Sequence, residues 1–251
     1  MRIGRKILAT ASIGGLVALL SGCSSANLPG FGFKKDVSSV NQTSISLWQF
    51  VVLAVIVVGV FTFILIMWPI FFHRKKNDEF PKQTQYNIPV EVAYTVIPFL
   101  IVAFLFYLTA KDESKITHIT PASQVVHEID VKGIQWSWQF TYADTKLPAE
   151  KSTVTGTPAQ PPVLVVPLGE KVQYVLTSND VVHGFWIPDF MIQMQTLPGV
   201  TNHLEFTAEK LGTFPGRCNI LCGRNHSQML FSVKVVTPAE YQTYLSTFKA
   251  A

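Results

Sequence analysis

The sequence predicts two membrane-spanning helices followed by an antiparallel β-sandwich that ends in a helix. Residues 45–72 contain no Asp, Glu, Lys, Arg or His, and residues 88–110 contain one charged residue. Residues 111–251 consist of short alternating apolar runs separated by Pro and Gly. With 48% hydrophobic residues, the chain is too apolar for one soluble domain. It has no basic stripe with interleaved aromatics, so we expect no nucleic acid partner.

The first 22 residues have the pattern of a secretory signal peptide. A basic start is followed by an apolar run over residues 7–20 that is too short to span a membrane comfortably. The run ends in Leu20-Ser21-Gly22-Cys23, which resembles a bacterial lipobox. This resemblance predicts cleavage before Cys23 and attachment of a lipid to its sulfur. The alternative is an ordinary signal peptide with an incidental Cys.

The apolar stretches 45–72 and 88–110 are long enough to cross a bilayer as helices. Trp48 and Trp68 lie near the two ends of the first stretch, where interfacial aromatics are common. The connecting loop, residues 73–87, is rich in Lys and Arg, so we expect it on the cytoplasmic side. Residues 23–44 and 111–251 then lie on the exterior, or periplasmic, side of a bacterial cell membrane.

Glu91 is the one charged residue of the second span. A carboxylate inside a span is costly and usually faces protein or water, which marks it as a candidate functional residue. The alternative is a solvated carboxylate, because Glu91 lies only about one turn from the cytoplasmic interface.

The outer domain, residues 111–251, reads as a sandwich of short strands with turns between them. Residues 134–142 predict one strand with four aromatics, Trp136 among them, on a single face. Residues 144–162 lack an apolar period and predict an exposed insertion. At the C-terminus, Thr237, Pro238 and Glu240 form a helix-start signature, and apolar residues repeat on one face behind it.

Four soft ligands are clustered near the C-terminus, in Cys218-x-x-x-Cys222-x-x-x-His226-x-x-Met229. Thiolate, thioether and imidazole groups together favour copper over hard cations. A second Cys four positions from the first lets two thiolates bridge two ions, so the spacing predicts a dinuclear copper centre that moves electrons. The alternative for two Cys in an oxidising compartment is a short disulfide.

A dinuclear site needs a second imidazole from elsewhere in the chain. His183 is the best candidate because it lies at a predicted strand end beside aromatics, whereas His203 begins a charged and exposed strand. A lone His in such a place is otherwise a structural residue. Met229 would be a weak axial ligand, and its alternative is a core Met that precedes a strand.

Over almost its whole length the sequence resembles subunit II of the haem-copper cytochrome c oxidases. The copper loop and the upstream Asp180-Val181-Val182-His183 carry this resemblance, together with the membrane hairpin and the Gln135-Trp136-Ser137-Trp138 stretch. The resemblance implies a cupredoxin-like Greek-key sandwich with a dinuclear copper A centre. In that family the centre accepts electrons from cytochrome c and passes them to haem in subunit I, where oxygen is reduced and protons are pumped.

The resemblance also assigns roles to individual residues. It implies that Cys218 and Cys222 bridge the coppers and that one histidine ligates each of them. Axial ligands would be the Met229 sulfur on one copper and the Ile220 carbonyl on the other. Trp136 would admit electrons, with a purely structural aromatic as the alternative, and Glu91 would lie at the mouth of a proton channel. The two histidines are His183 and His226.

Ile220 departs from the family pattern, which usually has Glu at that position. Its side chain cannot reach the magnesium that many relatives hold between subunits I and II, so we do not expect a conventional magnesium site. The acidic surface for docking a basic cytochrome c is also thin, so the donor is either cytochrome c or a membrane-bound cytochrome. Further expected partners are subunit I of aa3 type, with its haem and copper B, subunit III and the lipid bilayer.

Three other functions compete with this reading. Quinol oxidase subunit II has the same fold, but relatives of that type have lost the copper ligands. A free-standing membrane-anchored copper-binding lipoprotein would need no helical hairpin and no Glu91. A nitric or nitrous oxide reductase is the third, because related copper centres occur there.

Overall fold

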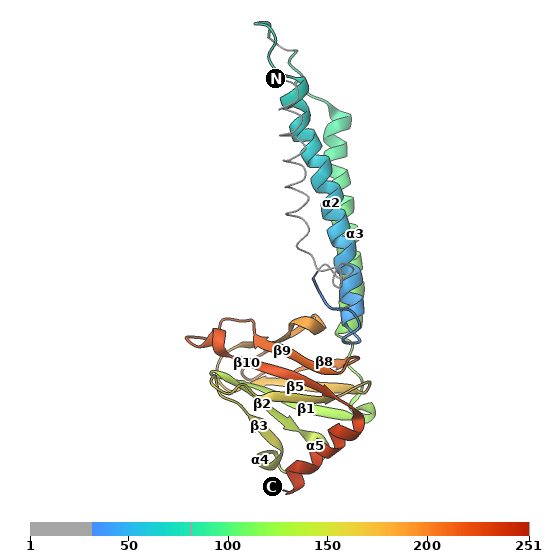
Figure 1. Cartoon of the computed structure of the whole chain (residues 1–251). Helices are drawn as coiled ribbons and strands as arrows, with labels where there is room; N and C mark the ends of the chain where they lie inside the picture. The colour runs from blue at the N-terminus through green and yellow to red at the C-terminus, as the bar shows by residue number, and fades with distance from the viewer. Residues whose placement is uncertain (1–31, 81, 251) are drawn as a thin grey trace, which may run out of the picture. The chain divides into compact units, whose positions relative to one another are not determined.

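The computed structural model describes residues 32–80 and 82–250 (Figure 1). The predicted signal peptide and Cys23 lie outside the described residues. The described chain divides into two compact units, which are treated separately below. One comprises residues 46–118, and the other comprises residues 32–45 together with residues 119–250.

The two apolar stretches form helices α2 (Asn41–Phe72) and α3 (Ile88–Ile116). Both are longer than the predicted spans 45–72 and 88–110. The first turn of α2 belongs to the outer domain, where Asn41 is buried and donates a hydrogen bond from Nδ2 to the Asp189 carbonyl. The part of α3 beyond the predicted span, residues 111–116, is rich in charged residues. The apolar residues decide where a span ends, but the helix itself continues into the polar segment.

The outer domain is a sandwich of two five-stranded sheets. The first sheet has the order β3-β2-β1-β5-β8 and the second has the order β4-β10-β9-β6-β7. The strands are β1 (His127–Ile134), β2 (Ser137–Tyr142), β3 (Thr153–Thr155), β4 (Val163–Pro167), β5 (Lys171–Ser178), β6 (His183–Ile187), β7 (Ile192–Thr196), β8 (Asn202–Thr207), β9 (Gly212–Cys218) and β10 (Leu230–Val236).

This arrangement confirms the predicted sandwich, with one correction. The sheets are mixed rather than antiparallel, because β1 pairs with β5 and β4 with β10 in parallel. Parallel pairs arise where the chain crosses from one sheet to the other between the paired strands. Alternating apolar residues show which face of a strand is buried, but they do not report the direction of its neighbour.

The insertion 144–162 contains more structure than its composition indicates. It holds the short helices η3 (Ala143–Thr145) and α4 (Ala149–Ser152) and the edge strand β3. The Thr141 and Thr153 hydroxyls lie 2.6 Å apart across the β2–β3 pair. A three-residue strand held by threonines has no apolar period that would reveal it.

The core between the sheets is aromatic. Trp138, Phe140 and Tyr142 of β2 are fully buried, as predicted. Phe231 of β10 lies 5.5 Å from Trp138 and stacks on Phe185 of β6 at 4.8 Å between ring centroids. Rings in these arrangements add to the hydrophobic stabilisation of the core.

Trp136 does not share that buried face. The β1–β2 pair ends with Ile134 opposite Ser137, so Gln135 and Trp136 form a two-residue hairpin turn. The strand predicted over 134–142 is therefore interrupted at its start. The turn places Trp136, half-buried, at one end of the sandwich rather than in its core.

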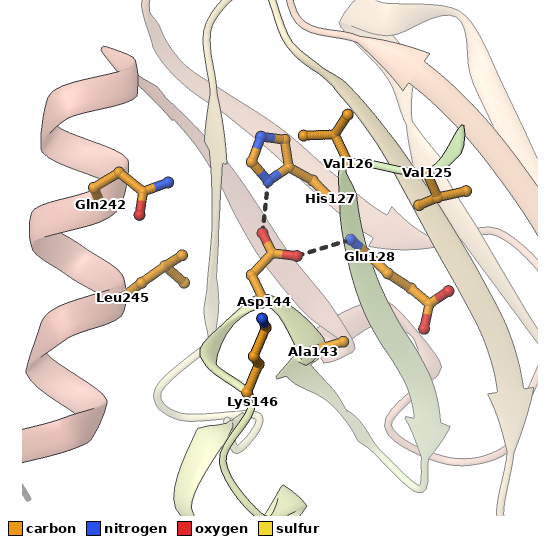
Figure 2. A pocket seen from close by; sticks show the side chains of 9 residues that line it. All are labelled: Val125, Val126, His127, Glu128, Ala143, Asp144, Lys146, Gln242 and Leu245. Atoms are coloured by element: carbon orange, nitrogen blue, oxygen red, sulfur yellow. Dashed lines mark hydrogen bonds and ion pairs between the residues drawn. The ribbon is translucent and has the colours of Figure 1, made fainter. Parts of the chain in front are cut away.

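The opposite end of β1 is fastened to the C-terminal helix α5 (Pro238–Ala250). His127 Nδ1 lies 2.6 Å from Asp144 Oδ2, and its Nε2 lies 2.8 Å from Glu170 Oε2. The Tyr241 hydroxyl of α5 donates to the same Asp144 oxygen at 3.1 Å. Figure 2 shows His127 and Asp144 in a cavity of about 420 Å³ beside α5. We call His127, Asp144, Glu170 and Tyr241 the His127 cluster.

As predicted, Thr237 and Glu240 form a capping box at the start of α5. Each of the two side chains accepts a hydrogen bond from the backbone amide of the other residue.

Candidate metal centre

The strands bring the predicted ligands to one end of the sandwich. His183 is the first residue of β6 and Cys218 is the last residue of β9. These strands pair so that Phe185 lies opposite Cys218. The Cys218 amide donates to the Met229 carbonyl at 3.0 Å, which closes the loop between β9 and β10 at its base. Segments separated by more than thirty positions in the sequence therefore meet at one point.

The sulfur and nitrogen atoms of this cluster lie within a few ångströms of one another. The two Cys Sγ atoms are 3.8 Å apart, and both thiols are buried and free. Cys222 Sγ lies 3.5 Å from His226 Nδ1 and 3.7 Å from Met229 Sδ. Cys218 Sγ lies 3.2 Å from the Ile220 carbonyl oxygen. A ring nitrogen of His183 lies within 4.8 Å of both sulfurs.

The sulfur spacing is that of two free thiols, and it leaves room for a metal ion. A disulfide holds its sulfurs about 2.05 Å apart, whereas the sulfurs here are 3.8 Å apart. Two metal–thiolate bonds of about 2.3 Å span at most about 4.6 Å. One ion can therefore touch both sulfurs at the observed separation without movement of the backbone.

His183 is oriented for a role as a ligand. Its side chain is fully buried, and Nε2 lies 2.8 Å from Asp180 Oδ1. Among the described residues, Nδ1 is a buried nitrogen with no hydrogen-bond partner. Such a nitrogen costs stability unless something occupies it. A carboxylate on the second ring nitrogen is also the usual support of a metal-bound imidazole.

The charge balance of the two thiols also favours a cation. Burial raises the pKa of Cys218, but His183 and nearby backbone groups outweigh it and lower the pKa to about 6. Burial and the neighbouring Cys218 charge raise the pKa of Cys222. Cys218 is therefore the more acidic thiol of the pair. Positive charge near the two sulfurs would favour the ionised form of both.

Two glycines leave room for the cluster. A Cβ on Gly133 would lie 2.6 Å from Cδ2 of His183. A Cβ on Gly184 would lie 2.7 Å from Cγ1 of Ile220 and would also collide with Asn219. A side chain at either position would displace a ligand-bearing residue.

Several residues that shape the site escaped the sequence reasoning. The sequence motif contains Asp180, but it does not predict that Asp180 holds His183. Gln135 has no predicted role, although its Nε2 donates to the Cys222 carbonyl at 2.8 Å. Trp136 Nε1 donates to the same oxygen at 3.1 Å. Of these contacts, the sequence could have indicated only the one between Asp180 and His183, because the two residues are three positions apart.

Comparison with known proteins places the chain. Residues 125–236 match the family model of the cytochrome c oxidase subunit II periplasmic domain, and residues 26–109 match that of its transmembrane domain. A probable cytochrome c oxidase subunit 2 of Streptomyces avermitilis is 36% identical over 96% of this chain and 86% of that protein. The chain belongs to the cytochrome c oxidase subunit II family.

Two further relatives of this oxidase subunit are informative. Cytochrome c oxidase subunit 2 of Mycobacterium tuberculosis is 33% identical, over 96% of this chain and 81% of that protein. The crystal structure of the periplasmic domain of cytochrome oxidase subunit II of Bradyrhizobium japonicum is 26% identical, with a TM-score of 0.43. It covers 53% of this chain and 98% of that chain. Family membership confirms the expected respiratory oxidoreductase subunit, and the transmembrane match agrees with a membrane anchor of two spans.

The remaining predicted residues are Glu91, in the helical unit, and Ile220, in the ligand loop. Glu91 is in the helical unit, where Oε1 accepts the Asn87 amide at 2.9 Å and so caps α3. Beside Ile220 is a cavity of about 430 Å³ whose described lining contains no carboxylate: Gln193, Met194, Gln195, Asn219 and Ile220.

Proposed function

We propose that this chain is the electron-entry subunit of an aa3-type cytochrome c oxidase. The observation that carries the proposal is the convergence of two free thiols, two imidazoles, a thioether and a carbonyl at one end of the sandwich. This donor set suits two copper ions bridged by thiolates and suits hard cations poorly. When bound, the copper pair would supply one-electron redox chemistry.

Each residue has a distinct part in this proposal. Cys218 and Cys222 would supply a thiolate each to the copper pair, and His183 and His226 would supply one imidazole each. Met229 and the Ile220 carbonyl would supply the two weaker ligands. Burial of both thiols and of His183 excludes water from one side of the centre. Anchoring by β6, β9 and β10 limits how far the ligands move when the oxidation state changes.

Trp136 is the proposed electron entry because it combines exposure with a direct link to the centre. It is half-buried in the hairpin turn, and its indole donates to the carbonyl of the proposed bridging residue Cys222. Electrons arrive from cytochrome c or a membrane-bound cytochrome and leave to haem in subunit I, which also holds copper B. Subunit III completes the expected assembly.

The membrane placement is part of the same proposal. The outer domain lies on the exterior side of a bacterial cell membrane, because the loop between the spans carries the Lys and Arg cluster. Cys23 is the proposed lipid attachment site, and Glu91 the proposed mouth of a proton channel. No observation favours the quinol oxidase or the free-standing lipoprotein, and the intact ligand set argues against the first.

Replacement of Cys222 with Ser tests the proposal in the assembled oxidase. We expect electron uptake from the donor to be lost, because an alcohol oxygen is a poor bridging ligand for copper. Stopped-flow reduction of the oxidase would measure this loss, and Ser246→Ala on helix α5 provides a hydroxyl change away from the ligands. Normal uptake in the Cys222→Ser oxidase would contradict the bridging role.

A further inference from the structure

Gln135 is bonded to both segments that carry the proposed ligands. Its backbone amide donates to Asp180 Oδ2 at 2.7 Å, and the other oxygen of Asp180 holds His183. Its side-chain Nε2 donates to the Cys222 carbonyl at 2.8 Å. The hairpin turn between β1 and β2 therefore connects the His183 segment with the loop between β9 and β10.

The Cys222 carbonyl receives two donors from this turn, Gln135 Nε2 and Trp136 Nε1. A carbonyl oxygen has two lone pairs, so both are in use. This fixes the peptide plane between Cys222 and Gly223 and with it the direction of the Cys222 side chain. Gly223 adopts φ +120°, and a Cβ there would lie 3.2 Å from Gln135 Nε2. The glutamine amide thus lies directly against the backbone of the loop.

The Cys222 segment needs such support because it lies in no strand or helix. Cys222 is 4% exposed, while the preceding Leu221 is 80% exposed. A buried thiol next to an exposed leucine depends on hydrogen bonds from outside the loop to remain covered. The donors that the structure shows at its carbonyl come from the hairpin turn.

We propose that Gln135 is a positioning residue that holds the Cys222 carbonyl and thereby sets the place of the Cys222 sulfur in the metal centre. The part of this inference that concerns copper rests on the proposed function. The part that concerns the thiol does not, because the contacts join protein groups alone.

Thiol labelling of the metal-free full chain in detergent tests the positioning role directly. We expect a maleimide to label Cys222 about fivefold faster in Gln135→Leu, the change that loss of one ordinary hydrogen bond produces in a local opening equilibrium. Peptide mass spectrometry resolves Cys222 from the other cysteines. Gln139→Leu is the matched control, because Gln139 lies on the same hairpin and bonds Thr155 instead.

Gln135→Glu separates hydrogen bonding from volume. It keeps the size of the side chain but turns an acceptor toward the Cys222 carbonyl, so we expect labelling at least as fast as in Gln135→Leu. If Gln135→Leu fails to fold, labelling of the Gln135→Glu variant still tests the positioning role of Gln135. Labelling of Cys222 at the wild-type rate in Gln135→Glu would overturn the proposal.

Copper ions provide the second arm of the experiment. We expect release of copper to a chelator to be about tenfold faster in Gln135→Leu than in wild type, with shifted sulfur-to-copper absorption bands and no change in Gln139→Leu. An unshifted spectrum with unchanged release would overturn the positioning role. If the wild-type chain binds no copper, the proposed function fails, while the labelling result still decides the role of Gln135.

Discussion

Two buried histidines at opposite ends of the sandwich have opposite surroundings. In the His127 cluster both ring nitrogens lie against carboxylates. In His183 one nitrogen lies against Asp180, and the other is buried without a hydrogen-bond partner among the described residues. The His127 ring, with hydrogen-bond partners at both nitrogens, helps to link helix α5 to the sandwich. The His183 ring lies next to two thiols and has one nitrogen without a hydrogen-bond partner. A nitrogen with a free lone pair is what a metal ligand requires.

This comparison shows that burial alone does not identify a ligand histidine. The two rings lie near opposite ends of β1, because His127 is its first residue and His183 lies against Gly133 near its end. What differs between them is the balance of donors and acceptors. A histidine between two carboxylates is stabilised as a cation, whereas a histidine beside thiolates can share a metal ion with them.

The largest expected effect comes from exchanging the same side chain at the two ends. We expect His183→Asn to weaken copper binding by more than about 100-fold, above the usual loss for an outer-shell residue. His127→Asn should keep the copper and lower the free energy of unfolding by about 1–2 kcal/mol, because it removes a buried hydrogen-bond partner of Asp144. Copper content and denaturant unfolding measure the two quantities. Loss of copper in His127→Asn would contradict the distinction between His183 as a ligand and His127 as a structural residue.

The next effect concerns the residue that orients His183. Burial raises the pKa of Asp180, but hydrogen bonds from His183, Gln135 and Val181 outweigh it and lower the pKa. The carboxylate therefore stays charged and fixes the imidazole. We expect Asp180→Asn to weaken copper binding by about tenfold, measured by competition with a chelator. Asp130→Asn, on the outer side of β1, is the matched control and should have no effect.

The smallest effect is a pH dependence at the His127 cluster. The hydrogen bond to Asp144 raises the pKa of His127, with a smaller opposing effect of burial. Because the pKa in the folded protein is above the unfolded value, the stabilisation is complete below about pH 6.5 and is lost as pH rises through the folded pKa. We expect wild type to lose stability over this window relative to His127→Asn.

Unfolding of both proteins in urea at several pH values measures that difference, since other titrating groups contribute equally to each. The exposed His203 offers a comparison, because His203→Asn should leave the wild-type pH profile unchanged. A wild-type profile parallel to that of His127→Asn would mean that the cluster holds α5 without a charged histidine.

The sequence was sufficient to predict the elements whose signal is local. Two long apolar stretches predicted the spans, the alternating aromatics of β2 predicted one shared face, and Thr237 with Glu240 predicted the cap of α5. The spacing from Cys218 to Met229 predicted the ligand loop, because neighbouring loop residues stay near one another in any fold. His183 is favoured over His203 by its place at a predicted strand end beside aromatics, but the sequence does not show which strand end lies against the thiols.

The features that escaped prediction depend on contacts between distant segments. The parallel pairing of β1 with β5 is set by the crossing of the chain between sheets, which no short window records. Gln135 was indistinguishable from any polar residue of a strand until the hairpin turn placed it against Cys222. Trp136 was misplaced for the same reason, since alternation continues through a two-residue turn without a visible break.

Electron paramagnetic resonance of the native oxidase tests the central claim most directly. Two coppers bridged by Cys218 and Cys222 should give a mixed-valence signal in which one unpaired electron is shared between two copper nuclei. A signal from a single copper, zinc at the site, or a Cys218–Cys222 disulfide without copper would contradict the account.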